Sequence, residues 1–278
     1  MSHRGPSDVL RIAHRGAGAM EKYAPKELLH VAEQGAHLVE FDLHVTGDDY
    51  LVARHDPVVS VDGVPTWLAD TELVEVLPTL QRAGVSTVEE VVRAARQAGL
   101  GLYADVKTMT VAAAERLALL LDSENMINKT ILASVRSDIV MRCAPATSGI
   151  PWAVLFASIL EDPVQLAASI DASYVHPCWE RLPRPDQLLA GAWLDRVRAH
   201  GLGVITWHEE RPAVVQSLYD LGVDGICTDE PMLLTQIASV DRPGLSTPCS
   251  DQPGKAQDRD AASTSTAWPG RTFSPRVR

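Results

Sequence analysis

The chain has 278 residues, of which 46% are apolar and 22% are charged, and its formal net charge is −11 at pH 7. This length suits one domain with one core, because eight-stranded α/β barrels of roughly 250 residues usually fold as a unit. The surplus of carboxylates argues against a nucleic-acid partner, whose phosphates must be met by Lys and Arg. It leaves room for a small phosphorylated substrate, since carboxylates can hold a divalent cation that supplies positive charge.

Short apolar runs alternate with longer amphipathic runs along residues 8–240. The runs expected to form strands are 9–13, 38–45, 50–53, 100–106, 130–135, 152–156, 172–175, 203–207 and 225–228. The runs with apolar residues at helical spacing are 25–34, 87–97, 111–121, 187–200 and 212–221. Several of the helical runs are followed by Gly, as expected of a helix C-terminus. This alternation predicts a parallel sheet with helical crossovers.

The strand count favours a closed TIM (β/α)8 barrel over an open doubly wound sheet. Counting 38–45 and 50–53 as one hairpin-like unit gives eight strand units. Polar residues also end strands along the whole chain, and in a barrel all those ends meet at one mouth. In an open sheet, only the strand ends near the switch point would meet. We therefore predict a single barrel domain over residues 1–240.

The remaining segment, residues 241–278, is rich in Pro, Ser, Thr, Gly and Asp. It has too few apolar residues to offset the entropy of folding, which predicts a disordered polar tail. No signal peptide and no run of eighteen apolar residues is found in the sequence. The four cysteines form no CxxC pair, which is typical of reduced, buried thiols. We expect a cytoplasmic protein without an integral membrane segment, and the oligomeric state stays open.

Three carboxylates are candidates for a metal site. Glu40 and Asp42 lie two residues apart on one predicted strand, so their side chains share a face, and Asp105 ends the next long strand. Carboxylates grouped inside a barrel are costly unless a cation neutralises them. Their oxygens suit Mg²⁺, with Ca²⁺ or Mn²⁺ as alternatives. A solvated, outward-facing pair is the competing interpretation for Glu40 and Asp42.

Two histidines are candidates for acid–base catalysis. His14 ends the first predicted strand, and His55 follows the hairpin at 50–53. Cleavage of a phosphodiester needs a base for the attacking group and an acid for the leaving alkoxide, and two His can fill both roles. Either residue alone would more often be structural. The sequence does not decide which would be the acid and which the base.

Two cations also lie at strand ends. Arg15 follows His14, and Lys107 shares the face of Asp105. Together they could bind the oxygens of a phosphate. Salt bridges to the three carboxylates are the alternative, and both can hold in the absence of substrate.

The order of these motifs resembles the glycerophosphodiester phosphodiesterase family. The matching stretches, which span about residues 9–240, are His14-Arg15-Gly16, Glu40-Phe41-Asp42, His55-Asp56-Pro57, Asp105-Val106-Lys107, Thr206-Trp207 and Gly222-Val223-Asp224-Gly225-Ile226-Cys227-Thr228-Asp229-Glu230-Pro231. The resemblance implies a TIM barrel and a divalent metal on Glu40, Asp42 and Asp105. It also implies catalytic histidines at His14 and His55 and a substrate-side aromatic at Trp207, for which a core Trp is the alternative.

The sequence departs from the family pattern at three places. The family's Pro-Glu-Asn-Thr reads Pro25-Lys26-Glu27-Leu28, so a cation replaces a carboxylate. The third metal ligand, usually Glu, is Asp105, in a stretch similar to that of the sphingomyelinase D-like enzymes. The family's Trp-Thr-Val-Asn reads Trp207-His208-Glu209-Glu210, which adds ionisable groups near the mouth. These changes motivate an expectation of retained phosphate-ester chemistry on an unusual substrate.

The sequence therefore predicts a metal-dependent phosphodiesterase that acts on a small phosphorylated substrate, with a lipid-derived substrate as one option. One alternative is a lyase that stops at a cyclic phosphate, or an enzyme that ionises a diphosphate ester at the same metal site. Another is a catalytically inactive barrel that binds a phosphorylated ligand. Retention of both histidines and all three carboxylates argues against an inactive barrel.

Overall fold

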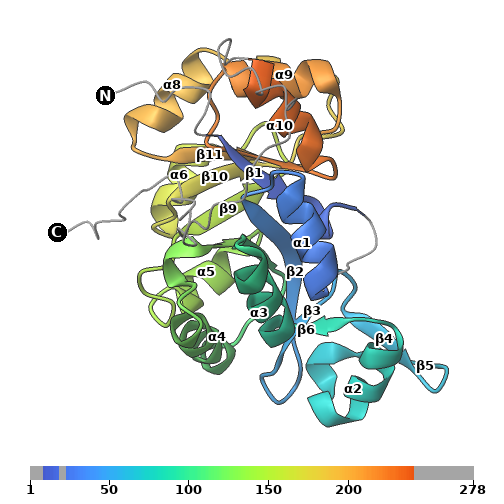
Figure 1. Cartoon of the computed structure of the whole chain (residues 1–278). Helices are drawn as coiled ribbons and strands as arrows, with labels where there is room; N and C mark the ends of the chain where they lie inside the picture. Colours follow the sequence, from blue (N-terminus) through green and yellow to red (C-terminus); the bar gives the residue numbers. More distant parts are fainter. Residues whose placement is uncertain (1–8, 19–22, 241–278) are drawn as a thin grey trace, which may run out of the picture.

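A closed barrel of eight parallel strands forms the centre of the computed structural model, which describes residues 9–18 and 23–240 (Figure 1). Its strands are β1 (Leu10–Ala13), β2 (Leu38–Val45), β7 (Gly101–Val106), β8 (Thr130–Ser134), β9 (Trp152–Phe156), β10 (Tyr174–Pro177), β11 (Gly203–Thr206) and β12 (Gly225–Thr228). Each strand pairs in parallel with its neighbours, and β1 closes the ring by pairing with both β12 and β2. This closure confirms the TIM barrel and excludes the open sheet.

Helices cover the outside of the barrel. They are α1 (Pro25–Glu33), α3 (Val88–Ala98), α4 (Val111–Ser123), α5 (Ser137–Cys143), α6 (Pro163–Ser169), α7 (Pro185–Leu189), α8 (Ala192–Ala199), α9 (Pro212–Asp220) and α10 (Pro231–Val240). The helix predicted over 187–200 is two helices, because Gly191 between them has φ 70° and ψ −131°, which a continuous helix cannot contain. The sequence analysis did not predict α5, α6 or α10. Seven-residue helices such as α5 and α6 show too few repeats for a clear pattern.

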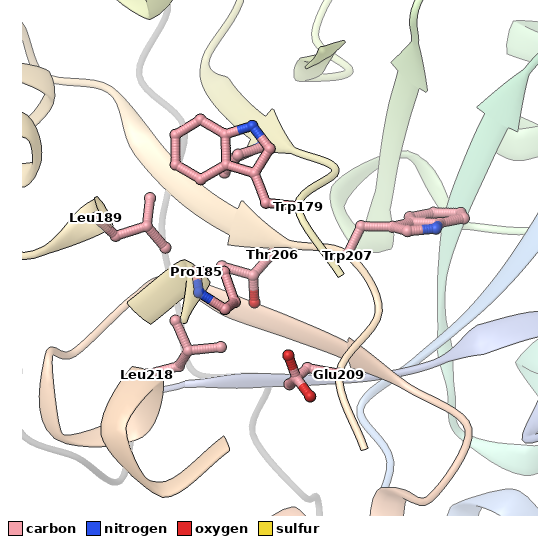
Figure 2. A pocket seen from close by; sticks show the side chains of 8 residues that line it. Trp179, Pro185, Leu189, Thr206, Trp207, Glu209 and Leu218 are labelled. Carbon is pink, nitrogen blue, oxygen red and sulfur yellow. The ribbon is translucent and has the colours of Figure 1, made fainter. Parts of the chain in front are cut away.

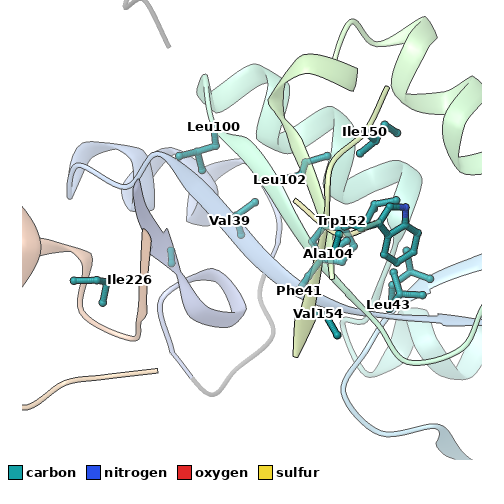
Figure 3. Close-up of a cluster of buried hydrophobic side chains, with 14 of the residues drawn as sticks. Val39, Phe41, Leu43, Leu100, Leu102, Ala104, Ile150, Trp152, Val154 and Ile226 are labelled. Carbon is teal, nitrogen blue, oxygen red and sulfur yellow. The ribbon is translucent and has the colours of Figure 1, made fainter. Parts of the chain in front are cut away.

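Alternation along the strands produces two apolar layers. Side chains such as Val39, Phe41 and Leu43 face the helices in the larger layer, as Figure 3 shows. Residues of the other parity, including Leu38 and Tyr103, fill the barrel interior in a smaller cluster. Because the side-chain period of a strand is two, the same parity that places Leu38 inside also places Glu40 and Asp42 inside. The barrel interior is therefore apolar near the beginnings of the strands and charged toward their C-terminal ends.

An insertion between β2 and α3 carries the second candidate histidine. It contains β3 (Leu51–Ala53), β4 (Val58–Val61), β5 (Val64–Trp67), the short helix η3 (Leu68–Asp70), α2 (Leu73–Arg82) and β6 (Ser86–Thr87). β3 runs antiparallel to β2, and Val52, Leu68 and Val76 belong to a small core of their own. The Arg54 N–H donates to the Asp42 carbonyl at 2.9 Å, so the chain that enters His55 is tied to the end of β2.

Two further short helices, η2 (His14–Gly16) and η4 (Ile127–Lys129), complete the secondary structure of the described residues. No helix among residues 9–18 and 23–240 is long and apolar enough to cross a membrane. The predicted polar tail at 241–278 lies outside the described residues. The domain boundary at residue 240 and the cellular location stay predictions.

Candidate active site

The three predicted carboxylates meet at the mouth of the barrel. β2 and β7 pair with Asp42 directly opposite Asp105, and Glu40 lies one interior position below Asp42. One oxygen from each carboxylate can be chosen so that all three lie within 4.8 Å of one another. All three residues are buried. The structure therefore brings together the side chains that the sequence grouped, and the outward-facing alternative is excluded.

Both predicted cations lie against this cluster. Arg15 Nε is 3.2 Å from Asp42 Oδ2, and Lys107 Nζ is 2.9 Å from Asp42 Oδ1 and bonded to Asp105. The Arg15 main-chain N–H donates to Glu40 Oε2 at 2.9 Å. Even so, Glu40 Oε1, both oxygens of Asp42 and Asp105 Oδ1 are buried without a well-aligned hydrogen bond. The ion pairs with Arg15 and Lys107 thus stabilise only part of the buried negative charge.

Burial dominates the electrostatics of the cluster. It raises the pKa of Glu40 well above its ordinary value, and the neighbouring Asp42 charge raises it further. Burial also raises the pKa of Asp105, although Lys107 opposes this shift. For Lys107, burial works against the charged form, but attraction to Asp105 and Asp42 outweighs it and the pKa is raised. The cluster favours cations, because a positive charge lowers the cost of every ionised carboxylate.

The donor set fits a hard divalent cation. Mg²⁺ and Ca²⁺ take carboxylate oxygens as ligands, and both leave positions open for water or substrate. Two buried oxygens of the cluster, Glu40 Oε1 and Asp105 Oδ1, have neither a hydrogen bond nor an ion pair to the described residues, as a ligand site prepared for a cation would require. Glu40, Asp42 and Asp105 are the residues that could hold it.

His14 is buried, with 7% of its surface exposed, in a tight turn directly after β1. The next residue, Arg15, has φ 45° and ψ 39°, in the left-handed region that side chains disfavour. This turn lets the main chain of Arg15 bond Glu40 while the His14 Nδ1–H donates to Asp229 Oδ1 at 2.7 Å. The bond to Asp229 fixes the ring tautomer and leaves buried Nε2 without a partner. It is also the main reason that the pKa of Asp229 is lowered.

A second imidazole lies on His14. The His208 ring stacks on it with centroids 4.5 Å apart and planes 12° apart. Its Nδ1–H donates to Glu210 Oε1 at 3.0 Å, which raises the pKa of His208. Ligand atoms of His14, His208 and Asp229 lie within 4.8 Å of one another. However, the two stacked rings lie in nearly parallel planes, so their nitrogen lone pairs do not point at a common position. The lone pairs of two imidazoles that bind the same metal must do so.

His55 is more exposed than His14. Its side chain is 46% exposed, and Nδ1–H donates to Asp56 Oδ1 at 2.9 Å, which lowers the pKa of Asp56. Its carbonyl accepts a hydrogen bond from His44 Nε2 at 3.1 Å, so a buried side chain of β2 holds the turn. A positive charge on His55 lowers the pKa of Asp105, because it stabilises the Asp105 carboxylate. His55 thus belongs to the mouth but on its solvent side.

His176 lies inside the barrel and had no role predicted from the sequence. Its Nδ1 shares a hydrogen bond with the Tyr103 hydroxyl, and burial lowers its pKa to about 3. The only available signal was a polar residue at the end of a strand. Likewise, Asp229 was one of several polar strand ends, and nothing in the pattern indicated that it would pair with His14. Contacts between residues 215 positions apart require the closed barrel.

The Trp207 ring contacts both His14 and His176. Its ring centroid is 5.0 Å from that of His14 and 5.3 Å from that of His176. Trp207 also borders a narrow pocket between the ends of β10 and β11 and helices α7 and α9 (Figure 2), whose lining is Pro177, Trp179, Pro185, Leu189, Thr206, Trp207, Glu209 and Leu218. None of the three carboxylates lines this pocket. We take the carboxylate cluster as the candidate active site, because it has unpartnered buried charge and the pocket is mostly apolar.

The chain is similar to known phosphodiesterases over most of its length. The profile of the Glycerophosphoryl diester phosphodiesterase family matches residues 14–233. YhdW of Bacillus subtilis strain 168 is 26% identical over 240 residues, which cover 79% of this chain and 94% of YhdW. A glycerophosphodiester phosphodiesterase of Caldanaerobacter subterraneus subsp. tengcongensis is 22% identical over 253 residues, with 82% and 97% coverage.

A solved structure shows the same fold. The Oleispira antarctica phosphodiesterase OLEI02445, in complex with the product sn-glycerol-3-phosphate, superposes with a TM-score of 0.65 at 18% identity, covering 83% of this chain and 96% of that one. The family match covers the barrel from His14 to beyond β12. The chain therefore belongs to the glycerophosphoryl diester phosphodiesterase family, a family of phosphoric diester hydrolases.

Proposed function

We propose that this protein hydrolyses a glycerophosphodiester with the help of a divalent cation held by Glu40, Asp42 and Asp105. The observation that carries the proposal is the buried carboxylate cluster, in which Glu40 Oε1 and Asp105 Oδ1 have no partner among the described residues, set beside a histidine whose tautomer Asp229 fixes. A cation held by these residues, with Mg²⁺ as the first choice, would supply positive charge to the phosphate. Arg15 and Lys107 add positive charge on the same side.

The two histidines have different surroundings, and these support different roles. His14 donates Nδ1–H to Asp229, so Nε2 carries a lone pair and can take a proton from the attacking hydroxyl. His55 lies on the solvent side, where it can donate a proton to the leaving alkoxide. We assign His14 as the base and His55 as the acid. Trp207, whose ring lies beside His14, would bound the substrate on that side.

The attacking hydroxyl is water or the neighbouring hydroxyl of the glycerol group. Intramolecular attack gains from proximity and would first give a cyclic phosphate. The sn-glycerol-3-phosphate bound by the Oleispira relative supports glycerol 3-phosphate as the end product here. A small phosphorylated substrate fits this assignment, and the alcohol released could be a lipid-derived head group.

Product analysis in ¹⁸O-labelled water tests the assignment. Glycerophosphocholine is incubated with the protein and Mg²⁺, beside the His14→Ala and His55→Ala variants. We expect glycerol 3-phosphate that carries one solvent oxygen, and a loss of about 100-fold or more in kcat for each variant. A control, His30→Ala, changes an exposed histidine on α1 and should leave kcat unchanged.

Other results would favour one of the alternative functions or overturn the role of a histidine. A cyclic phosphate without solvent oxygen would support the lyase alternative. Binding without turnover under Mg²⁺, Ca²⁺ and Mn²⁺ would support an inactive phospho-ligand-binding barrel. Wild-type rates in either histidine variant would overturn the role given to that residue.

A further inference from the structure

The departure Trp207-His208-Glu209-Glu210 places a hydrogen-bonded pair directly against His14. The His208 ring covers one face of the His14 ring at 4.5 Å, while Trp207 meets His14 in an edge-on contact at 71°. The two rings contact neighbouring sides of the imidazole, since their own centroids are 6.4 Å apart, and both contacts limit its rotation. The Asp229 bond adds a third constraint, in the plane of the ring.

Glu210 connects these constraints. Its Oε1 accepts one hydrogen bond from His208 Nδ1–H at 3.0 Å and another from the Asp229 main-chain N–H at 3.1 Å. A single oxygen therefore fixes both the ring that stacks on His14 and the main chain of its acidic partner. Neither His208 nor Glu210 belongs to the carboxylate cluster.

We propose that His208 and Glu210 act as a positioning pair for His14, holding its ring plane and its bond to Asp229 so that Nε2 stays available to a substrate. Neither residue contacts the reacting atoms in this scheme. The kinetic part of the inference rests on the proposed diesterase function, in which His14 is the base. The structural part, an ordered His14 tautomer, does not depend on turnover.

The physical cost of losing the pair follows from geometry. Without His208, one face of the His14 ring opens to solvent, and the ring can turn away from its productive orientation. Without a Glu210 oxygen, the Asp229 main chain loses a partner and the His208 ring loses its anchor. Displacement of a catalytic group by about 1 Å can cost on the order of 100-fold in rate.

Four single variants separate positioning from packing. His208→Ala removes the stacked ring and should lower kcat by about 10-fold or more with little change in KM. His208→Phe keeps a flat ring and should recover most of that loss. Glu210→Ala should resemble His208→Ala, whereas Glu210→Gln keeps an acceptor oxygen and should remain within a few-fold of wild type. The double variant His208→Ala/Glu210→Ala should be no slower than the slower single variant.

Imidazole ¹⁵N NMR on the full chain, without substrate or metal, gives a readout independent of activity. In the wild type we expect His14 to show protonated Nδ1 and unprotonated Nε2. In His208→Ala and Glu210→Ala we expect averaged tautomer signals and loss of the hydrogen-bonded Nδ1 proton. His30→Ala and Glu33→Ala alter a matched, exposed His–Glu pair on α1 and should change neither kcat nor the His14 signals.

The outcomes distinguish this inference from the proposed function. Wild-type kcat and an unchanged His14 spectrum in both alanine variants would overturn the positioning pair. A rise in KM at constant kcat would also overturn it, because that result assigns the pair to substrate binding. If the wild-type protein has no diesterase activity, the proposed function fails, and the NMR spectra alone decide whether the pair orders His14.

Discussion

Glu40 has the deepest position among the carboxylates of the mouth. It is fully buried, one of its oxygens lacks a partner, and burial together with Asp42 raises its pKa well above the ordinary value. Folding therefore favours the protonated form. The stability associated with that form is complete below the unfolded pKa of about 4.3 and is lost as the pH rises through the folded pKa. Ionisation of Glu40 in the folded protein is therefore costly, and a bound cation would relieve that cost.

Replacing Glu40 by Gln should therefore have opposite effects on stability and on metal binding. We expect Glu40→Gln to raise the unfolding free energy of the metal-free protein at pH 7.5 by about 1 kcal/mol, as relief of active-site strain commonly does. Mg²⁺ should stabilise the wild type, by mass action, and leave the variant unchanged. Urea unfolding in EDTA and in Mg²⁺ measures both effects. Glu89→Gln, at an exposed ion pair on α3, is the control. A destabilised variant that still responds to Mg²⁺ would contradict this account.

His176 should contribute to acid sensitivity. Its folded pKa is about 3 and its unfolded pKa about 6.5, so the unfolded chain binds the extra proton between these values. Stability is therefore complete above pH 6.5 and falls as the pH falls, by at most about 1.4 kcal/mol per pH unit. His176→Gln should flatten the slope of unfolding free energy between pH 6.5 and 4.5, and the slope rather than the absolute stability is the quantity compared. His30→Gln should leave the slope unchanged, and an equal slope in His176→Gln would refute the assignment.

At the scale of elements, the pairing of β10 with β11 depends on a missing side chain. Gly203 lies opposite Tyr174 in the register, and a Cβ built on Gly203 would come within 2.5 Å of the Tyr174 ring and 3.2 Å of Asp224. Asp224 in turn accepts a hydrogen bond from the Val204 N–H at 2.8 Å. The ring and the carboxylate thus occupy the space above the glycine. This packing fixes how the first residues of β10 and β11, at the end of the barrel opposite the mouth, lie against each other.

Gly203→Ala should therefore cost about 1–3 kcal/mol, because overpacking of a buried site forces neighbours to move. Gly225→Ala on β12 is a graded control, since its nearest contacts would be 3.2–3.3 Å from side-chain atoms. We expect a smaller loss there, measured by the midpoint of urea unfolding at constant m-value. A larger loss for Gly225→Ala than for Gly203→Ala would contradict the packing described here.

Elements were predictable where the local pattern was strong. The apolar runs at β2, β7, β9 and β12 are long or sharply bounded, and they are strands within one residue of the expected limits. The helix expected over 187–200 failed at Gly191, because helical spacing continues across it while its backbone does not. The hairpin of β4 and β5 was missed since its residues are largely exposed and show no clean alternation.

For the whole molecule, the sequence predicted the barrel and the meeting of Glu40, Asp42 and Asp105, because strand parity and barrel closure together decide which side chains converge. The same reasoning placed Arg15 and Lys107 at the mouth. It could not give the Asp229 bond to His14 or the stacking of His208, which depend on how the loops after β11 and β12 fold back over β1. Loop conformation is not encoded in a periodic pattern.

In the proposed function, the carboxylate cluster holds a cation that diester cleavage requires. The most direct measurement is release of glycerol 3-phosphate from glycerophosphocholine as Mg²⁺ is titrated into EDTA-treated protein, with Asp42→Asn beside the wild type. Asp138→Asn, at an exposed ion pair on α5, serves as the matched control. We predict saturable Mg²⁺ dependence in the wild type and in Asp138→Asn, and a loss of about 100-fold or more in Asp42→Asn. Turnover that persists in EDTA, or that survives Asp42→Asn, would contradict the account.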